Sequence, residues 1–185
     1  MLKKSGDLAV EIKEPIFSGL EKWSPGWFRE GSFLVTNLSP EPQKLYLKSG
    51  NATGSTELAQ TLNLFVKSGQ NKFYGFEPAK NLADFWQEDE IDLMTLPGKG
   101  VSKVDLTLVF DAAAGNFYQD KSLSFNLIVG LENSQSEISL TEVLGSQTQA
   151  YFKRPLSLFL LTLLFLLLLF WLVRCFLDLR RRLSL

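Results

Sequence analysis

An uncharged apolar run near the C-terminal end constrains this chain more than any other feature. Residues 156–173 read LSLFLLTLLFLLLLFWLV, which is 18 residues with 11 leucines and no ionisable side chain. An 18-residue helix is about 27 Å long, close to the hydrocarbon thickness of a bilayer. A helix packed in a soluble domain shows a polar face to solvent, and this run has none. The run therefore predicts one transmembrane helix over residues 155–174, anchored in lipid by side chains that include Leu156, Phe159, Leu163, Phe170 and Trp171.

Basic residues on both sides of the run predict its orientation. Lys153 and Arg154 precede it, and a larger group follows it, including a basic tail over residues 175–185. Basic residues concentrate on the cytoplasmic side of membrane helices. The sequence therefore predicts a single-pass protein of the cell membrane, with the N-terminal domain outside and the C-terminus in the cytoplasm. The charges that set this topology are Arg174, Arg180, Arg181 and Arg182.

The first residues leave the route to the membrane open. Lys3 and Lys4 give a charged start, but no apolar segment of the kind found in a signal peptide follows them. Two interpretations remain: a signal lies upstream of Met1, or the chain is a tail-anchored cytosolic protein.

Composition excludes several classes of function. The chain has 185 residues and no histidine, which removes Ser-His-Asp triads, Cys-His pairs and HExxH zinc helices together. Its single cysteine, Cys175, has no partner for an intramolecular disulfide. Residues 1–150 carry 13 basic and 19 acidic side chains, an acidic balance that does not suit nucleic acid. We therefore expect a non-enzymatic domain with no cofactor and no nucleic-acid partner.

Period-two alternation dominates the first 131 residues. Each of six segments has one apolar face, and connections rich in Gly, Pro, Asn and Ser separate them. This pattern predicts an all-β, antiparallel, jelly-roll-like β-sandwich over residues 1–131, with one short helix over residues 78–86. Residues 132–154 are polar and predict a stalk between this domain and the membrane. The six predicted strands are 8–12, 33–36, 44–48, 62–67, 103–110 and 122–131.

Two turns stand out in this domain. Pro25-Gly26 is typical of a type II turn, and Gly115-Asn116 predicts a hairpin turn between strands 104–110 and 122–131. We expect Tyr118 and Gln119 to pack on that second turn and to cap it.

Three aromatic residues, Trp23, Trp27 and Phe28, surround the first turn. They fit either a lid on the sandwich core, which is the more ordinary interpretation, or an aromatic binding patch.

Carboxylates and sequons supply the remaining candidate chemistry. Glu88-Asp89-Glu90 with Asp92 suits either calcium, through hard oxygen ligands, or simply a solvated loop, which is the more ordinary outcome. A polar segment, 133–142, has EF-hand-like spacing but lacks the first carboxylate and the turn glycine, so we interpret residues 141–144 as a short amphipathic helix. Asn37 and Asn51 lie in glycosylation sequons.

Several short motifs occur in an order that resembles the camelysin/TasA family of surface and biofilm-matrix proteins. They are GDLAV at residues 6–10, WSPG at 23–26, FLVTN at 33–37 and AGNFYQDKSLSF at 114–125. The resemblance covers about residues 6–131 and implies a structural or adhesive role at the cell surface, with assembly into fibres. The chain departs from the family pattern at Trp27 and Asp120 and in its membrane anchor, which suggests a surface-tethered relative.

The first strand is where such assembly would occur. Relatives are thought to polymerise by donating this strand, so copies of this chain or related surface proteins are the expected partners. Completing its own sheet is an equally supported alternative for this strand. A non-polymerising surface module that presents loops to a carbohydrate, ion or protein is the competing function. The residues of the candidate exchange strand are Leu8, Val10 and Ile12.

Overall fold

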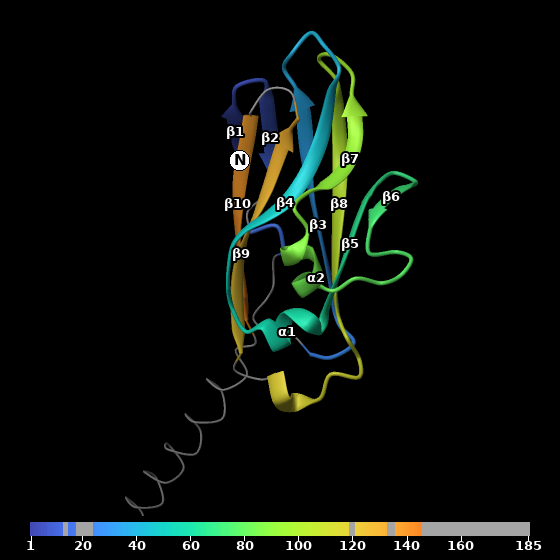
Figure 1. Ribbon diagram of the computed structural model, residues 1–185, viewed down its shortest axis with the longest axis vertical. Helices are drawn as coiled ribbons and strands as arrows, with labels where there is room; N and C mark the ends of the chain where they lie inside the picture. Colours follow the sequence, from blue (N-terminus) through green and yellow to red (C-terminus); the bar gives the residue numbers. More distant parts are fainter. Residues whose placement is uncertain (13–14, 18–23, 119–120, 133–135, 146–185) are drawn as a thin grey trace, which may run out of the picture. The chain divides into compact units, whose positions relative to one another are not determined.

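The computed structural model describes residues 1–12, 15–17, 24–118, 121–132 and 136–145. They lie in the compact unit Met1–Gln147, and Thr148–Leu185 form a second unit. In chain order the elements are β1 (Leu2–Ser5), β2 (Leu8–Ile12), β3 (Phe28–Asn37), β4 (Gln43–Gly54), α1 (Thr56–Gln60), β5 (Leu62–Ser68), β6 (Asn71–Tyr74), α2 (Leu82–Gln87), β7 (Ile91–Leu96), β8 (Val101–Phe110), the 3-10 turn η2 (Asn116–Tyr118), β9 (Ser122–Leu131) and β10 (Ser136–Gly145) (Figure 1).

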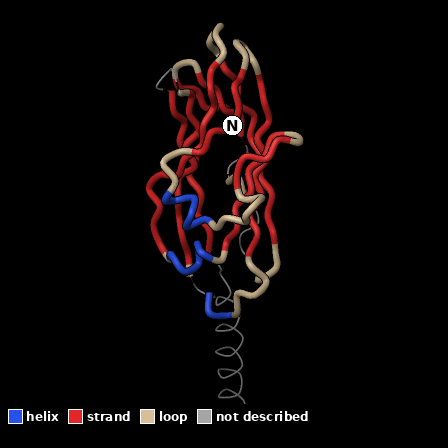
Figure 2. The backbone as a smooth tube through the Cα atoms, turned by 45° about the vertical axis from the view of Figure 1, so that its right-hand side comes forward, coloured by secondary structure: helices blue, strands red, loops and turns tan. Residues whose placement is uncertain are grey.

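The strands form two antiparallel sheets. One sheet has six strands in the order β1-β2-β3-β8-β5-β6, and the other has four in the order β10-β9-β4-β7. Strands make up most of the body, and both α-helices lie toward one end of it (Figure 2). The prediction of an antiparallel β-sandwich with little helix is confirmed.

Alternate side chains of the two sheets fill the space between them. From Val104 in β8 and from Leu123 in β9, every second residue is a buried Val, Leu or Phe, as the period-two pattern predicts. Burying a side chain of this size stabilises the fold by about 1.5–3 kcal/mol. Because all the described core residues lie within Met1–Gln147, we expect residues 1–147 to fold on their own. The central members are Val104, Leu106, Leu108, Phe110, Leu123, Phe125, Leu127 and Val129, each 3% exposed or less.

The stalk predicted over residues 132–154 is wrong for residues 136–145. These residues form β10, which pairs with β9 from Ser136↔Leu131 to Gly145↔Ser122. Ile138, Leu140 and Leu144 are buried, and the intervening Ser, Glu and Thr residues hid this alternation in a polar composition. The same strand excludes the short helix expected at residues 141–144. Residues 146–154 lie outside the described residues.

The predicted hairpin between strands 104–110 and 122–131 is also wrong. β8 pairs with β3 and β5, whereas β9 pairs with β10 and β4, so the connection crosses from one sheet to the other. Gly115 and Asn116 therefore lie in a crossover that contains η2. Two residues at a tight turn indicate a change of direction, but they do not determine which sheet the next strand joins.

The short helix is present, but it begins later than predicted. Asn81, rather than Pro78, caps α2, because its side-chain oxygen accepts a hydrogen bond from the Asp84 backbone nitrogen at 2.9 Å. The Asp84 carboxylate accepts a bond from the Asn81 nitrogen at 3.1 Å in return, which completes a capping box.

The first two strands form a hairpin at the edge of the six-stranded sheet. β1 pairs with β2, and β2 pairs with β3 from Leu8↔Asn37 to Ile12↔Phe33. The Lys3 ammonium donates to the Ser139 carbonyl at 3.1 Å, and the Asp7 backbone nitrogen donates to the Ser136 hydroxyl at 3.1 Å. β1 is an edge strand of the six-stranded sheet and β10 is an edge strand of the four-stranded sheet, and these two strands therefore meet along one side of the sandwich.

Candidate functional site

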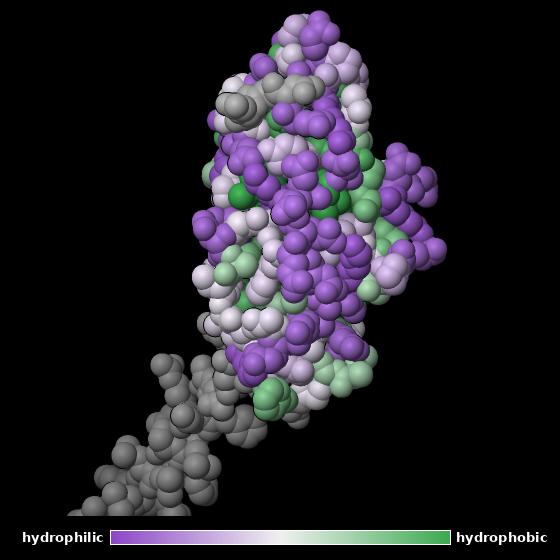
Figure 3. All heavy atoms as spheres, in the orientation of Figure 1, coloured by the Kyte–Doolittle hydropathy of each residue, from purple (hydrophilic) through white to green (hydrophobic). Residues whose placement is uncertain are grey.

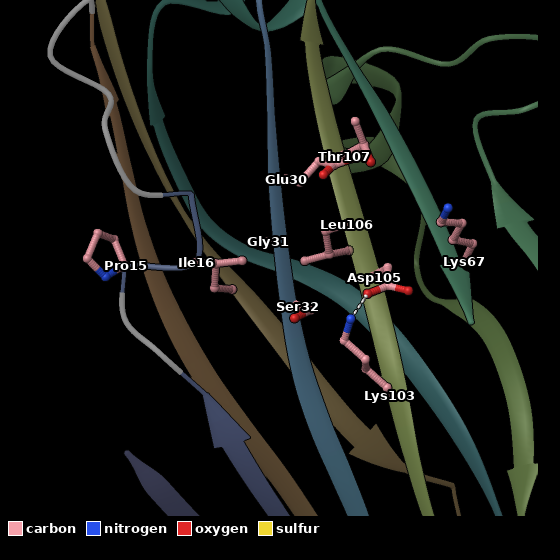
Figure 4. Close-up of a pocket in the computed structure, with 10 residues that line it drawn as sticks. All are labelled: Pro15, Ile16, Glu30, Gly31, Ser32, Lys67, Lys103, Asp105, Leu106 and Thr107. Atoms are coloured by element: carbon pink, nitrogen blue, oxygen red, sulfur yellow. Dashed lines mark ion pairs between the residues drawn. The ribbon is translucent and has the colours of Figure 1, made fainter. Parts of the chain in front are cut away.

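A shallow polar groove lies on the outer face of the six-stranded sheet. Glu30 and Ser32 come from β3, Lys67 comes from β5, and Lys103, Asp105 and Thr107 come from β8 (Figure 4). Strand register sets these side chains beside one another, because Asp105 lies opposite both Ser32 and Lys67. The groove encloses about 440 Å³ and is partly open to solvent.

Pro15 and Ile16 form one wall of this groove, and a glycine makes their position possible. A Cβ atom at Gly31 would lie 2.3 Å from the Ile16 Cγ2 and 2.7 Å from its carbonyl oxygen. Real Cβ atoms do not approach other atoms so closely, so only glycine lets this segment rest on β3. Ile16 and Phe17 are both buried.

The chemistry of the groove suits polar binding. The Lys103 ammonium lies 2.7 Å from the Asp105 carboxylate (Figure 4), and hydroxyls from Ser32 and Thr107 flank that pair. Ammonium, carboxylate and hydroxyl groups together donate and accept hydrogen bonds, as recognition of a hydrophilic ligand requires.

A second polar cluster lies on the outer face of the four-stranded sheet. The Tyr46 hydroxyl donates to the Glu137 carboxylate at 2.6 Å, and the Lys48 ammonium contacts the same oxygen. These bonds, the one from Lys48 first, hold the pKa of the Glu137 carboxyl below its usual value. Burial, aided by the bond to Glu137, raises the pKa of the Tyr46 phenol. The cluster links β4 to β10 across β9. The face of the body shown in Figure 3 is mostly hydrophilic.

The structure disperses the acidic residues considered as a calcium site. Glu88 lies 2.6 Å from the Lys80 ammonium, and Asp92 lies 2.8 Å from that of Lys44. Asp92 belongs to β7 rather than to a loop. Among the described residues, no group of three or more Asp, Glu, Cys or His side chains is placed to hold a metal ion.

The turn at Pro25-Gly26 is confirmed. Gly26 has a φ of 84°, and the Trp27 backbone nitrogen donates to the Ser24 carbonyl at 3.0 Å, as a type II turn requires.

The lid interpretation is wrong for the two described aromatics beside that turn, because Trp27 is 46% exposed and Phe28 is 57% exposed. Both stand at the sandwich end rather than over its core. Trp23 lies outside the described residues.

The aromatic residues of the crossover divide between core and surface. Tyr118 packs edge-to-face on the core residue Phe110, with ring centroids 6.3 Å apart. Its expected role in capping the turn at Gly115-Asn116 stays a prediction. Phe117, which the sequence did not single out, is 72% exposed and lies under the Lys121 ammonium at 4.3 Å. Gln119 lies outside the described residues.

The candidate exchange strand is β2, and it is interior rather than terminal. Leu8, Val10 and Ile12 are at most 3% exposed, and β1 covers the side of β2 that faces away from β3. In this structure these residues complete their own sheet, as the alternative interpretation expected. Any exchange must therefore move the β1–β2 hairpin as a unit.

The anchor residues and topology charges from Leu156 to Arg182 lie outside the described residues. Within the part that the structure describes, no helix has the length and apolar character needed to cross a membrane.

One of the two sequons is closed to modification in the folded domain. Asn37 is 0% exposed, and its amide nitrogen donates to the carbonyls of Glu41, Leu96 and Pro97 at 2.8–3.3 Å. Its side-chain oxygen accepts a bond from the Ser39 nitrogen at 2.9 Å. Asn51, in the other sequon, is exposed.

Comparison with known proteins yields only remote likenesses. No family model and no curated protein sequence match the chain. A family 123 glycoside hydrolase from Clostridium perfringens aligns with a TM-score of 0.44 at 7% identity, covering 75% of this chain and 27% of the hydrolase. This chain thus spans about a quarter of that enzyme.

Two further solved structures show how varied the proteins with a remotely similar fold are. The PapD-like domain 7 of human CEP192 aligns with a TM-score of 0.38 at 16% identity, covering 77% of this chain and 86% of that one. The CooA pilin subunit from enterotoxigenic Escherichia coli aligns with a TM-score of 0.36 at 13% identity, covering 66% and 84%. Similarity at this level carries no inference about activity or partner, and the resemblance to the camelysin/TasA family stays a prediction.

Proposed function

We propose that this chain is a membrane-anchored structural or adhesive protein of the cell surface, a jelly-roll-like sandwich tethered by one C-terminal helix. The observation that carries the proposal is the uncharged run at residues 156–173, which follows a domain with its own complete core. The excess of arginine after this run supports an external domain and a cytoplasmic C-terminus. The resemblance to TasA-type matrix subunits supports the structural role.

We propose no catalytic role for the domain. The sequence has no histidine, and Lys103 already neutralises the Asp105 carboxylate in the polar groove. A general acid or base requires a side chain that is poised to exchange a proton with substrate. The polar groove and the outer faces of the two sheets suit binding and assembly.

The anchor has a direct test. The full chain should remain in the membrane pellet after extraction at alkaline pH, whereas a chain lacking residues 156–173 should be released into the supernatant. Release of the full chain by the same extraction would contradict the proposal.

Assembly by strand exchange is the more specific part of the proposal. The β1–β2 hairpin contributes Leu8, Val10 and Ile12 to the core, so a domain without it exposes an apolar groove beside β3. An identical hairpin from a neighbouring copy would fill that groove with the same contacts.

A domain of residues 14–147 should therefore bind a synthetic peptide of residues 1–13. Replacing Val10 with Asp in the peptide should abolish that binding, because Val10 is fully buried. Strand exchange is excluded if the intact domain of residues 1–147 stays monomeric at high concentration and the truncated domain does not bind the native peptide.

The polar groove favours one alternative function, a surface module that binds a hydrophilic partner such as a carbohydrate without polymerising. Lys103→Ala and Asp105→Ala in the domain of residues 1–147 should then abolish binding to a glycan array. Loss of array binding with monomeric behaviour would favour this alternative over assembly.

A further inference from the structure

One end of the sandwich exposes aromatic side chains that no core or loop covers in the described residues. Trp27 and Phe28 are 46% and 57% exposed, and Phe117 is 72% exposed. Single exposed apolar residues are normal on a soluble surface, but several exposed aromatic rings at one end of a domain are typical of an interaction surface.

Two of these aromatics, Trp27 and Phe117, are linked through Phe110 and Tyr118. The Phe110 backbone exchanges hydrogen bonds with Gly26 and Trp27, and the Phe110 ring packs on Tyr118. The Tyr118 ring in turn contacts that of Phe117, with centroids 5.5 Å apart. Hydrophobic atoms are visible at this end of the body, over η2 (Figure 3).

Cationic groups lie beside the rings. The Arg29 guanidinium lies 5.3 Å from the Trp27 ring centroid, and the Lys121 ammonium lies 4.3 Å from that of Phe117. Glu57 and Asp111, which are exposed at the same end, balance these two charges. Aromatic rings with flanking cations are typical of surfaces at the lipid–water interface.

The chain that follows β10 limits how far the aromatic end can lie from the apolar run at residues 156–173. Gly145, the last residue of β10, pairs with Ser122, which directly follows Lys121. Residues 146–155 separate Gly145 from the apolar run, and ten residues span at most about 35 Å even when fully extended. The described chain therefore leaves the sandwich at its aromatic end, and the tether from there to the apolar run is at most about 35 Å long.

We propose that Trp27, Phe28 and Phe117 dock this end of the domain on the lipid surface beside its own anchor. A short tether gives a millimolar effective concentration, so even a weak interfacial contact is populated. Because Arg29 and Lys121 are balanced by Glu57 and Asp111 among the described residues, burial of the rings, rather than net charge of the described surface, drives docking. The inference rests on the proposed membrane anchor.

The experiment measures depth in the full chain. A nitroxide is attached to a cysteine at Ala112, which is exposed at the aromatic end, in a Cys175→Ser chain reconstituted into phosphatidylcholine vesicles. The matched control carries the label at Val101, which is 60% exposed at the other end of β8. Collisions with oxygen, which partitions into lipid, and with a water-soluble nickel chelate report the depth of each label.

Docking predicts a several-fold higher oxygen-to-nickel collision ratio at residue 112 than at residue 101. Replacing Trp27, Phe28 and Phe117 together with serine should return the ratio at residue 112 to the aqueous value. If the label at residue 112 has the aqueous collision ratio while the chain is bound to the vesicles, docking is wrong but the anchor stands. The same conclusion follows if the triple replacement leaves the ratio at residue 112 unchanged. A chain that does not float with the vesicles overturns the anchor and docking together.

Discussion

At one end of the sandwich Asn37 is wholly buried and its amide holds three backbone carbonyls, whereas at the other end Trp27, Phe28 and Phe117 stand exposed. The strand β3 connects these two ends, with Phe28 as its first residue and Asn37 as its last. A buried polar group is stabilising only when it is fully bonded, and exposed rings contribute little to stability. The comparison separates an end that maintains the fold from an end that is available for contact.

The largest expected effect is at the buried end. Asn37→Ala removes the donors to Glu41, Leu96 and Pro97 and leaves those carbonyls without that partner. We expect the free energy of unfolding of residues 1–147 to fall by roughly 3 kcal/mol, measured by urea denaturation. The control Asn71→Ala, at an exposed position in β6, should change it by less than about 0.5 kcal/mol. Equal effects at the two positions would contradict the comparison.

A smaller effect is expected where residues 15–17 rest on β3 near the aromatic end. Gly31→Ala places a Cβ against the Ile16 carbonyl and should lower the free energy of unfolding by about 1–3 kcal/mol. Gly115→Ala is the matched control, because a Cβ there meets no atom within 4 Å. If Gly31→Ala is as harmless as the control, the packing of residues 15–17 on β3 is not as described.

The cluster on the four-stranded sheet should give a pH-dependent effect below about 1 kcal/mol, since its side chains are partly exposed. The pKa of Glu137 is lowered in the folded domain, so its contribution is present above the unfolded value near 4.5 and is lost as pH falls through the folded value. Glu137→Gln should therefore destabilise the domain at pH 7 and hardly at all at pH 3. An equal change in the free energy of unfolding at both pH values would exclude this role.

The smallest effect is expected at the aromatic end itself. Replacing Trp27, Phe28 and Phe117 with serine should leave the free energy of unfolding of residues 1–147 within about 0.5 kcal/mol per site, because the rings are exposed. A loss of several kcal/mol would mean that these rings belong to the core, and the contrast between the two ends would disappear.

Strands with an uninterrupted apolar alternation were predictable from the sequence. β9 follows that alternation along its length, β8 follows it from Val104 to Phe110 and β5 from Leu62 to Val66, whereas β3 shows it only from Phe33 to Val35. β10 was missed because Ser, Glu and Thr fill its outward positions. β7 was missed because Asp92 and Thr95 interrupt a short apolar segment and a bulge opposite Leu45 and Tyr46 shifts its register.

The surfaces were less predictable than the strands. Lys67, Ser32 and Asp105 lie side by side only because β5 and β3 flank β8, and alternation along a strand does not indicate its neighbours. Phe117 gave no periodic signal because it lies in a 3-10 turn between the sheets. Asn37 directly followed the predicted strand 33–36, but only the loops that converge on it show that it is buried.

The most direct test of the central claim is a topology measurement on the full chain in intact cells, with an epitope tag after Leu185. Protease added outside should digest the domain of residues 1–147 and leave the tag on a membrane-bound fragment that contains residues 156–173. The account predicts that the tag becomes accessible only after the cells are permeabilised. Digestion of the tag in intact cells, or survival of the whole domain until permeabilisation, would contradict a surface domain held by a C-terminal anchor.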